Sequence, residues 1–243
     1  MKTAFITGAN GGLGLELSNF FLKNNWSVIA ACRNKKDFPK DIADNKNIKI
    51  ISLDLTNQKS FDTAIKSIGK TKIDVLINNA GLYDSPSVDD NVVISKIADI
   101  EKVFEVNTIG PKVLADHFVE NLLSSEEKLV VTISSGMGTY AQLWGLDLEA
   151  TSRGTKDTYV AEHWMYSASK TAVNFAMLCF GILHPEIKSV LINPGWMKTC
   201  IGGSSAPLTP AFSAEKIFGL ISDHKNKLPN GKIVNYEGKV MDF

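Results

Sequence analysis

The chain has little of what marks a secreted, metal-binding, membrane-spanning or polyanion-binding protein. Its three cysteines, Cys32, Cys179 and Cys200, are an odd and scattered set, which excludes a disulfide framework or a cysteine metal cluster. No apolar run approaches the roughly 18 residues that a membrane-spanning helix needs. Lysine plus arginine (26) equals aspartate plus glutamate (26), so no net charge attracts nucleic acid or anionic lipid.

What is present fits a folded protein of one domain. Hydrophobic residues make up 44% of the chain, which together with zero net charge disfavours disorder. The length suits one large core, so we expect a single domain over residues 1–243. There is no room for a signal peptide before Gly8, which predicts a cytoplasmic protein. The histidines lack metal-ligand spacing and are expected on the surface or in the core: His117, His163, His184 and His224.

Short β-rich runs alternate with amphipathic stretches along the chain, the pattern of a parallel sheet covered by helices. Most of the runs are continuous in Val, Ile and Leu, as expected for strands buried on both faces. The pattern predicts a Rossmann-like, doubly wound α/β domain with about seven parallel strands and helices on both faces. The candidate strands are Thr3–Thr7, Ser27–Ala31, Ile48–Ser52, Asp74–Asn78, Lys128–Ile133, Lys188–Ile192 and Lys232–Tyr236.

Apolar residues at helical spacing fill the intervals between these strands. One set, Val93, Ile97, Ile100 and Phe104, predicts a longer helix, and a further helical stretch follows Gly110-Pro111. Other apolar helical positions are Leu13, Leu17, Phe20, Phe21, Phe61, Ala64, Ile65, Ile68, Val113, Leu114, Phe118 and Leu122. The segment Gly136–His163 breaks this rhythm, and a loop of that length in a compact domain is usually functional or disordered. We expect it to cover a ligand.

A glycine-rich turn, Thr7–Gly14, follows the first strand and opens the first helix. Glycine is needed where the backbone turns tightly, approaches a pyrophosphate and packs a helix against a strand. The phosphates would meet the free N–H groups and the positive dipole end of that helix. The strand-turn-helix context therefore predicts a dinucleotide cofactor, whereas a turn without a ligand is the plainer alternative.

The end of the second strand indicates which dinucleotide is bound. NAD sites usually carry an acidic side chain roughly 20 residues after the glycines. Arg33 stands in that region, followed by Lys35 and Lys36, and no carboxylate occurs from the start of the second strand at Ser27 until Asp37. Since a guanidinium can pair bidentately with a 2′-phosphate, we expect NADP(H) to be favoured over NAD(H). The alternative is a solvated surface arginine.

Together, these motifs resemble the short-chain dehydrogenase/reductase family over nearly the whole chain. TGANGGLG is similar to TGxxxGxG through Gly8, Gly12 and Gly14, although Gly11 lets it equally satisfy the TGxxGxxG of the longer epimerase-like branch. The short chain and the NNAG sequence favour the reductase branch. The other family motifs, in chain order, are Asp54-Leu55, Asn78-Asn79-Ala80-Gly81, Tyr166-Ser167-Ala168-Ser169-Lys170 and Asn193-Pro194-Gly195.

Within that branch, PGWMKT followed by Gly202-Gly203 resembles the carbonyl-reductase and C-factor (sniffer-like) group. That group usually has aspartate where this chain has Cys200. The resemblance implies that Met197 and Thr199 contact the nicotinamide, and an N-cap of the next helix is a second reading of Thr199. It further implies the cofactor-binding residues Gly8, Asn10, Gly11, Gly12, Leu13, Gly14, Arg33, Asp54, Leu55, Asn79, Ala80, Gly81, Tyr166, Lys170, Pro194, Gly195, Met197 and Thr199.

Tyr166 and Lys170 are four residues apart, so a helix places them on one face. Carbonyl reduction needs a proton donor at the oxygen, and a tyrosine with its usual pKa near 10 is a poor one. A nearby ammonium favours tyrosinate and lowers that pKa. The resemblance assigns proton transfer to Tyr166, and assigns to Lys170 a second role on the nicotinamide ribose.

Ser134 and Ser135 follow the fifth strand at its carboxyl end, where doubly wound sheets bind ligands. A hydroxyl there can bond the substrate oxygen and stabilise its developing charge. The resemblance favours Ser135 over Ser134. It also implies that Asn107, otherwise an ordinary polar residue of a helix, holds a proton-relay water. The catalytic set is therefore Asn107, Ser135, Tyr166 and Lys170.

Substrate contacts are expected from Ser135, Tyr166 and Trp196, with residues 196–212 as a mobile substrate loop. The extended segment 136–163 makes the distance from Ser135 to Tyr166 longer than is usual in the family. Aromatic residues near this segment line the pocket or belong to the core: Tyr140, Trp144 and Trp164. His163 lies three residues before Tyr166 and is a possible pocket contact. Cys32 and Cys179 read as buried small hydrophobes, and Cys200 as the cysteine near a ligand.

The preferred hypothesis is an NADPH-dependent reductase that transfers hydride to a ketone or aldehyde carbonyl, with alcohol oxidation as the reverse. One alternative is an NADP(H)-binding sensor or signalling protein with little turnover, and another is an epimerase-like enzyme. The expected partner is a neutral carbonyl or alcohol compound, with no metal, nucleic acid or membrane. The family resemblance implies a homodimer or homotetramer through the helices of Asn107 and Tyr166, although burial within the monomer also explains their apolar faces, including Ala172, Val173, Phe175, Ala176 and Phe180.

Overall fold

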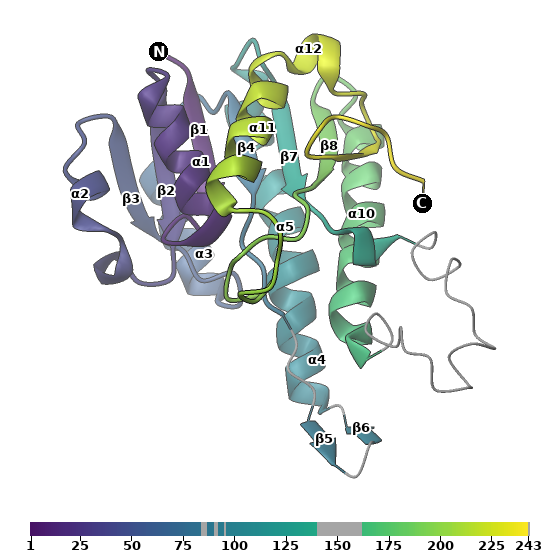
Figure 1. The fold of residues 1–243 in the computed structure, drawn as a ribbon. Coiled ribbons are helices and arrows are strands. Elements are labelled where there is room, and N and C mark those ends of the chain that lie inside the picture. Colours follow the sequence, from purple (N-terminus) through teal and green to yellow (C-terminus); the bar gives the residue numbers. More distant parts are fainter. Residues whose placement is uncertain (84–86, 90–91, 95, 140–161, 243) are drawn as a thin grey trace.

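Seven parallel strands form one sheet in the order β3-β2-β1-β4-β7-β8-β9 (Figure 1). The computed structural model describes residues 1–83, 87–89, 92–94, 96–139 and 162–242. The sheet strands are β1 (Thr3–Thr7), β2 (Ser27–Cys32), β3 (Ile48–Ser52), β4 (Val75–Asn78), β7 (Leu129–Ile133), β8 (Lys188–Asn193) and β9 (Ile233–Asn235). The predicted parallel α/β fold is confirmed, and each predicted strand ends within one residue of its observed bounds.

Helices cover both faces of this sheet because successive strand residues point to opposite sides. On one face, α1 (Gly12–Lys23) and α11 (Pro210–Ser222) bury apolar side chains against residues such as Ile6 and Val131. On the other face, Phe5 and Val130 pack under α3 (Gln58–Ile68), α5 (Gly110–His117), α6 (Val119–Leu123) and α10 (Trp164–Leu183). In Figure 1, α1 and α11 lie in front of the sheet. The short helices are α2 (Lys40–Ala43) and α12 (His224–Lys227).

One predicted helix begins later than its apolar spacing suggested. Val93 lies in strand β6 (Val92–Ile94), which pairs antiparallel with β5 (Ser87–Asp89), a hairpin that was not predicted. Three consecutive β-branched residues lose side-chain freedom in a helix and suit a strand, so propensity overrides the apparent period. The helix that follows, α4, spans Ile97–Phe104.

The sequence predicts that Asn107 lies in a regular helix, but the structure places it in a π-helical turn, Glu105–Ile109. This turn joins α4 directly to α5, so Gly110-Pro111 does not separate two helices. The Gly110 N–H donates to the Glu105 carbonyl, five residues back. Pro111 has no N–H for the Asn107 carbonyl four residues before it, so the regular α ladder is interrupted at that residue.

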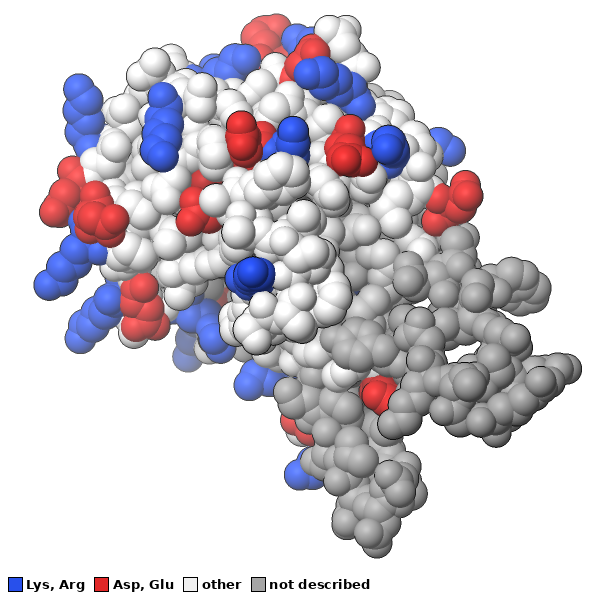
Figure 2. All heavy atoms as spheres, in the orientation of Figure 1, with Lys and Arg blue, Asp and Glu red and all other residues white. Residues whose placement is uncertain are grey.

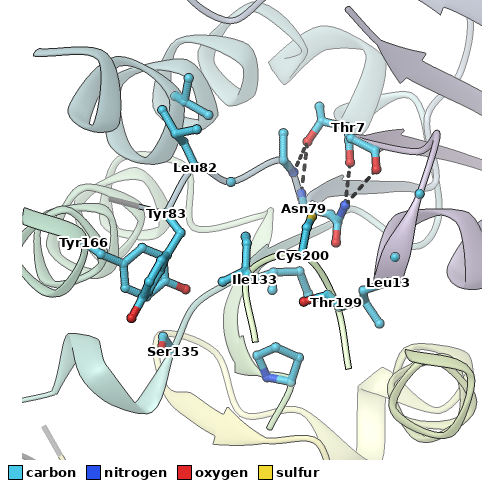
Figure 3. A pocket seen from close by; sticks show the side chains of 18 of the residues that line it. Thr7, Leu13, Asn79, Leu82, Tyr83, Ile133, Ser135, Tyr166, Thr199 and Cys200 are labelled. Carbon is cyan, nitrogen blue, oxygen red and sulfur yellow. Dashed lines mark hydrogen bonds between the residues drawn. The ribbon is translucent and has the colours of Figure 1, made fainter. Parts of the chain in front are cut away.

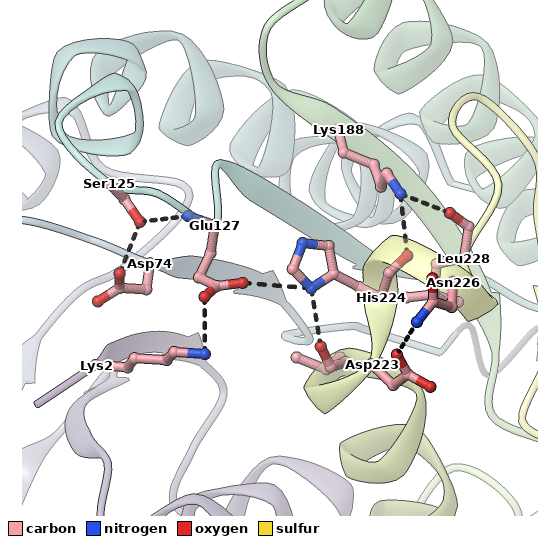
Figure 4. A network of polar contacts seen from close by, with 10 residues as sticks. Lys2, Asp74, Ser125, Glu127, Lys188, Asp223, His224, Asn226 and Leu228 are labelled. Carbon is pink, nitrogen blue, oxygen red and sulfur yellow. Dashed lines mark hydrogen bonds and ion pairs between the residues drawn. The ribbon is translucent and has the colours of Figure 1, made fainter.

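A charged network ties the strands together at the amino end of the sheet (Figure 4). Lys2 Nζ lies 2.7 Å from a Glu127 carboxylate oxygen, and His224 Nδ1 lies 3.6 Å from the other. Lys188 Nζ donates to the carbonyls of His224 and Leu228, each at 3.0 Å. Burial raises the pKa of Glu127, but the hydrogen bond and charge of Lys2 outweigh it and hold that pKa below its usual value. The network therefore stabilises the edge of the sheet opposite to the strand carboxyl ends.

Charged side chains are interspersed in sign over the face in Figure 2, consistent with the balanced composition. Within the described ranges, no helix is long and apolar enough to cross a membrane. The same ranges hold no group of three or more His, Cys, Asp or Glu side chains that could bind a metal ion.

Candidate active site

A pocket of about 1080 Å³ opens at the carboxyl ends of β1, β4, β7 and β8. Ligands of doubly wound sheets bind at this edge. The predicted catalytic, cofactor-binding and substrate residues all line the pocket except Gly14 and Asn107, which are buried. Those that line it are Gly8, Asn10, Gly11, Gly12, Leu13, Arg33, Asp54, Leu55, Asn79, Ala80, Gly81, Ser135, Tyr166, Lys170, Pro194, Gly195, Trp196, Met197 and Thr199. Residues that are far apart in the sequence therefore share one cavity (Figure 3).

The glycine turn uses its glycines for different purposes. Gly8 and Gly12 have positive φ angles of 63° and 52°, which favour glycine. A Cβ on Gly14 would lie 2.3 Å from the Gly8 carbonyl oxygen, so α1 can pack against the turn only without a side chain. Gly11 is extended, with φ at −170°, and a Cβ there would meet nothing within 4 Å. The backbone thus requires the glycines of TGxxxGxG, and Gly11 is not required by the fold.

The start of α1 faces the pocket through Gly12 and Leu13. The first N–H groups of a helix lack partners within the helix and carry the positive end of its dipole. Together with the close approach that the glycines permit, this arrangement suits the pyrophosphate of a dinucleotide.

The chain after β4 is held on two sides. The Thr7 hydroxyl accepts hydrogen bonds from the N–H groups of Asn79 (2.9 Å) and Ala80 (3.0 Å). Leu82, two residues after Ala80, is held by the Asn107 side chain, which accepts from the Leu82 N–H at 2.7 Å and donates to the Leu82 carbonyl at 2.8 Å. The segment from Asn79 to Leu82 is therefore fixed along the pocket wall. Asn107 holds this segment by the hydrogen bonds of its side-chain amide, although Asn107 itself does not line the pocket.

Lys170 reaches the pocket from the second turn of α10 and is almost fully buried. Its Nζ donates to the Ile133 carbonyl at 2.8 Å and lies 5.6 Å from the centre of the Tyr166 ring. Burial disfavours the ammonium and lowers the pKa of Lys170 to about 8. A Cβ on Gly81 would lie 3.8 Å from Lys170 Nζ and 3.7 Å from Asn107 Oδ1, so the three residues meet at one point.

The two serines after β7 have different environments. The Ser134 hydroxyl is buried and donates to Asn174 Oδ1 at 2.6 Å. The Ser135 hydroxyl accepts from the Met137 N–H at 3.2 Å and, as a half-buried group, faces the pocket beside Tyr166 (Figure 3). Ser134 lines the same cavity, but its hydroxyl proton is directed to Asn174. The geometry therefore favours Ser135 as the group available to a ligand.

At the far end of the pocket, Arg33 follows β2 and Asp54 follows β3. Arg33 is exposed, and its carbonyl accepts from the Ser52 hydroxyl at 2.9 Å, which fixes the backbone there. The Asp54 carboxylate accepts from both the N–H and the hydroxyl of Thr56, at 3.0 and 2.8 Å. The exposed Arg33 side chain and the turn at Asp54 therefore form this end of the pocket.

The segment after β8 forms another side of the pocket. Trp196 is 55% exposed, and its indole N–H donates to the Gly202 carbonyl at 2.7 Å. The Thr199 hydroxyl accepts from the Gly202 N–H at 3.1 Å. The alternative reading of Thr199 as the N-cap of the next helix is wrong, because Thr209 caps α11 by accepting from the Phe212 N–H. Thr199 instead shapes a local turn.

The cysteines and the aromatic residues near segment 136–163 were also predicted to lie in the core or at the pocket. Cys32 is buried as predicted, Cys179 is only half-buried, and the exposed Cys200 lines the pocket. Trp164 is 41% exposed and is not among the pocket-lining residues. Tyr140 and Trp144, with most of the segment 136–163, fall outside the residues that the structure describes.

Tyr83 is a pocket residue that the sequence reasoning missed. Its ring centre lies 4.8 Å from that of Tyr166 and 4.6 Å from that of His163. Its position two residues after NNAG was the available signal, but pairing with a ring 83 residues away depends on the fold. Thr7 and Lys102 also line the pocket without having been predicted.

Comparisons with known proteins show the family to which this chain belongs. The short chain dehydrogenase family model matches residues 2–147. The chain is 24% identical, over its whole length and 98% of the relative, to the short-chain dehydrogenase/reductase tropE of Talaromyces stipitatus. The structure of NADPH-bound carbonyl reductase from chicken fatty liver is 26% identical with a TM-score of 0.81, covering 100% of this chain and 99% of that one. The carbonyl reductase Sniffer of D. melanogaster is 28% identical with a TM-score of 0.80, covering 100% of both chains. Because the matched segment spans more than half of the sequence, this chain belongs to the short-chain dehydrogenase family and is an oxidoreductase.

Proposed function

We propose that this protein reduces the carbonyl group of a ketone or aldehyde with NADPH, and oxidises the corresponding alcohol in reverse. The observation that carries the proposal is one pocket that holds the glycine turn, a buried Lys170 beside Tyr166, and Ser135. The positive φ angles of Gly8 and Gly12 and the helix start next to them fit a bound dinucleotide. The cofactor, when bound, supplies the hydride.

The residues of the pocket have complementary roles at the substrate oxygen. Ser135 would donate a hydrogen bond to it, and Tyr166 would deliver the proton as the carbonyl becomes an alcohol. Lys170 is mostly protonated at neutral pH, since its pKa is about 8. An ammonium 5.6 Å from the phenol ring stabilises tyrosinate, which remains after the proton leaves. Asn107 positions this set through Leu82 and α10.

A consumption assay tests the reaction. Purified protein, NADPH and a panel of neutral ketones and aldehydes should give loss of NADPH absorbance with at least one compound. Tyr166→Phe should abolish turnover while leaving NADPH affinity nearly unchanged, because the ring remains and only the proton donor is lost. Turnover that survives this substitution would refute the mechanism. Tight NADPH binding without turnover over the whole panel would instead favour the sensor alternative.

The preference for NADPH rests on Arg33, which is exposed at the pocket edge after β2, with Lys35 and Lys36 next to it. A guanidinium pairs with a phosphate through parallel hydrogen bonds, and NADH has no 2′-phosphate. Arg33→Ala should therefore weaken NADPH binding by about tenfold or more and change NADH binding little. Equal losses for both cofactors would refute the assignment. The chicken carbonyl reductase is described as NADPH-bound.

We also propose a homodimer or homotetramer that forms through α5 and α10, in a cytoplasmic location. Large apolar side chains are exposed beside and along these helices: Ile109 (53%), Phe175 (70%), Ile182 (77%) and Leu183 (69%). By contrast, Val173 and Phe180 of α10 are buried in the core. Phe175→Glu should convert the assembly to monomer in light-scattering measurements, and a wild-type monomer would refute this part of the proposal.

A further inference from the structure

We propose that Tyr83 is a positioning residue for Tyr166: its ring closes one side of the Tyr166 phenol and keeps the hydroxyl aimed at the substrate oxygen. The inference rests on the proposed function, which gives Tyr166 its role in proton transfer. It adds a residue that neither the motifs nor the family comparison identify.

The ring contacts provide the first observation. The Tyr83 and Tyr166 rings are inclined at 60° with their centres 4.8 Å apart, a tilted geometry that aromatic pairs prefer. The His163 ring centre lies 4.6 Å from that of Tyr83. Tyr166 is only 8% exposed even though it lines an open pocket. Figure 3 shows the two tyrosine rings side by side near Ser135. Tyr83 therefore packs against the Tyr166 ring where both residues line the pocket.

The backbone before Tyr83 provides the second observation. Thr7 binds the N–H groups of Asn79 and Ala80, and Asn107 binds both main-chain groups of Leu82. Tyr83 is the next residue. A side chain on so constrained a backbone can act as a fixed wall, since its Cα cannot move without breaking these hydrogen bonds.

The same amide also sets the position of Tyr166. Asn107 Nδ2 donates to the Ser169 hydroxyl at 3.0 Å, and that hydroxyl donates to the Tyr166 carbonyl at 2.7 Å. The neighbouring Thr108 hydroxyl donates to the Ser169 carbonyl at 2.8 Å. One buried residue therefore sets both the loop that carries Tyr83 and the first turn of α10 that carries Tyr166. The distance between the rings is fixed by the fold.

This arrangement predicts an effect on the rate of the chemical step. A phenol that leaves its productive orientation transfers its proton less often, while the cofactor and substrate still bind. Because the ring supplies the contact, Tyr83→Phe should retain the function and Tyr83→Leu should not. If Tyr83 instead contacted the substrate, its replacement would raise KM, and the size of that increase would depend on the shape of the substrate.

The kinetic test compares full-length wild type, Tyr83→Phe and Tyr83→Leu on benzaldehyde and cyclohexanecarbaldehyde, a matched aromatic and aliphatic pair. Tyr83→Leu should lower kcat about tenfold on both aldehydes, with KM and the NADPH dissociation constant within about twofold of wild type. Tyr83→Phe should keep kcat within about twofold. Three results would each overturn the proposal: an unchanged kcat in Tyr83→Leu, a loss confined to benzaldehyde, or an equal loss in Tyr83→Phe.

A second measurement does not depend on turnover or on the substrate. Protein with ¹³C-labelled tyrosine rings should show one sharp, dispersed set of Tyr166 signals, assigned by their absence in Tyr166→Phe. In Tyr83→Leu, or in Tyr83→Met should the leucine variant not fold, these signals should shift and broaden, and in Tyr83→Phe they should stay sharp. Unaltered signals in the aliphatic variant would overturn the proposal. A wild type that reduces no carbonyl would refute the proposed function, and the ring signals would still decide the role of Tyr83.

Discussion

Asn107 holds both main-chain polar groups of Leu82, accepting from its N–H at 2.7 Å and donating to its carbonyl at 2.8 Å. The remaining Nδ2 hydrogen goes to the Ser169 hydroxyl at 3.0 Å, so the whole donor set of the amide is used. A buried residue in a π-helical turn thereby joins the loop after β4 to the helix that carries Tyr166 and Lys170. This link makes the geometry of the candidate site depend on one side chain that does not line the pocket.

Asn107→Asp should impair both stability and turnover. The substitution replaces the two donated hydrogen bonds by an acceptor that faces the Leu82 carbonyl and the Ser169 hydroxyl, and a buried acceptor without a donor costs about 1–3 kcal/mol. Urea unfolding and kcat measure the two effects. Asn121→Asp is the matched control, because it loses buried donations to Gly69 and Thr71 (both 2.8 Å) away from the pocket. It should lose stability with kcat retained. A normal kcat in Asn107→Asp would contradict the positioning role.

The two serines after β7 should separate stability from catalysis. Ser134→Ala leaves the buried Asn174 Oδ1 without its donor, which should lower the free energy of unfolding by about 1–3 kcal/mol and spare kcat. Ser135→Ala should lower kcat about 10²-fold or more through the loss of a donor at the substrate oxygen, with unfolding nearly unchanged. The reverse pattern would show that Ser134 is the catalytic hydroxyl.

The glycine turn offers a second matched pair. In Gly14→Ala the new Cβ would lie 2.3 Å from the Gly8 carbonyl oxygen and 2.5 Å from Asn79 Nδ2, so the free energy of unfolding should fall by about 1–3 kcal/mol. In Gly11→Ala the Cβ meets nothing within 4 Å, and stability should change by less than about 1 kcal/mol. Gly11→Ala should nevertheless weaken NADPH binding, because position 11 faces the expected pyrophosphate. Calorimetry of folding and of binding distinguishes the two, and unchanged NADPH affinity would contradict the assigned site.

Lys170 should give cofactor-free protein a stability that rises with pH. Its pKa is about 8 in the fold and 10.5 ordinarily, so between these values the unfolded chain holds the proton that the folded chain has lost. The free energy of unfolding therefore gains from this group as pH rises from about 8 to 10.5, by about 3 kcal/mol in total. Lys170→Met removes the buried charge and should be more stable than wild type at pH 7, while losing turnover. The difference in free energy of unfolding between the variant and the wild type, measured by urea unfolding, should shrink toward pH 10.5. A difference that stays constant with pH would contradict the lowered pKa of Lys170.

Much of the fold could be predicted because the local signals agree with one another. Continuous Val, Ile and Leu runs mark strands buried on both faces, and β1 and β3 have the predicted bounds. The errors lie where two local preferences compete. Val93 fits both a helical period and a β-branched run, and pairing with β5 decides for the strand. The π-helical turn at Asn107 was not predictable from helical spacing, because a single turn of five residues is too short to show a period of its own.

The sequence by itself determined the family, the glycine turn and the residue types of the candidate site, because each motif is local and brings its own backbone requirement. Only the tertiary structure decided that the Ser134 hydroxyl donates to Asn174, that a side chain at Gly11 would meet no steric obstacle, and that Thr209 and not Thr199 caps α11. It also placed Tyr83 against Tyr166. These outcomes depend on contacts between residues far apart in the chain, whose distances are set by packing and long-range hydrogen bonds.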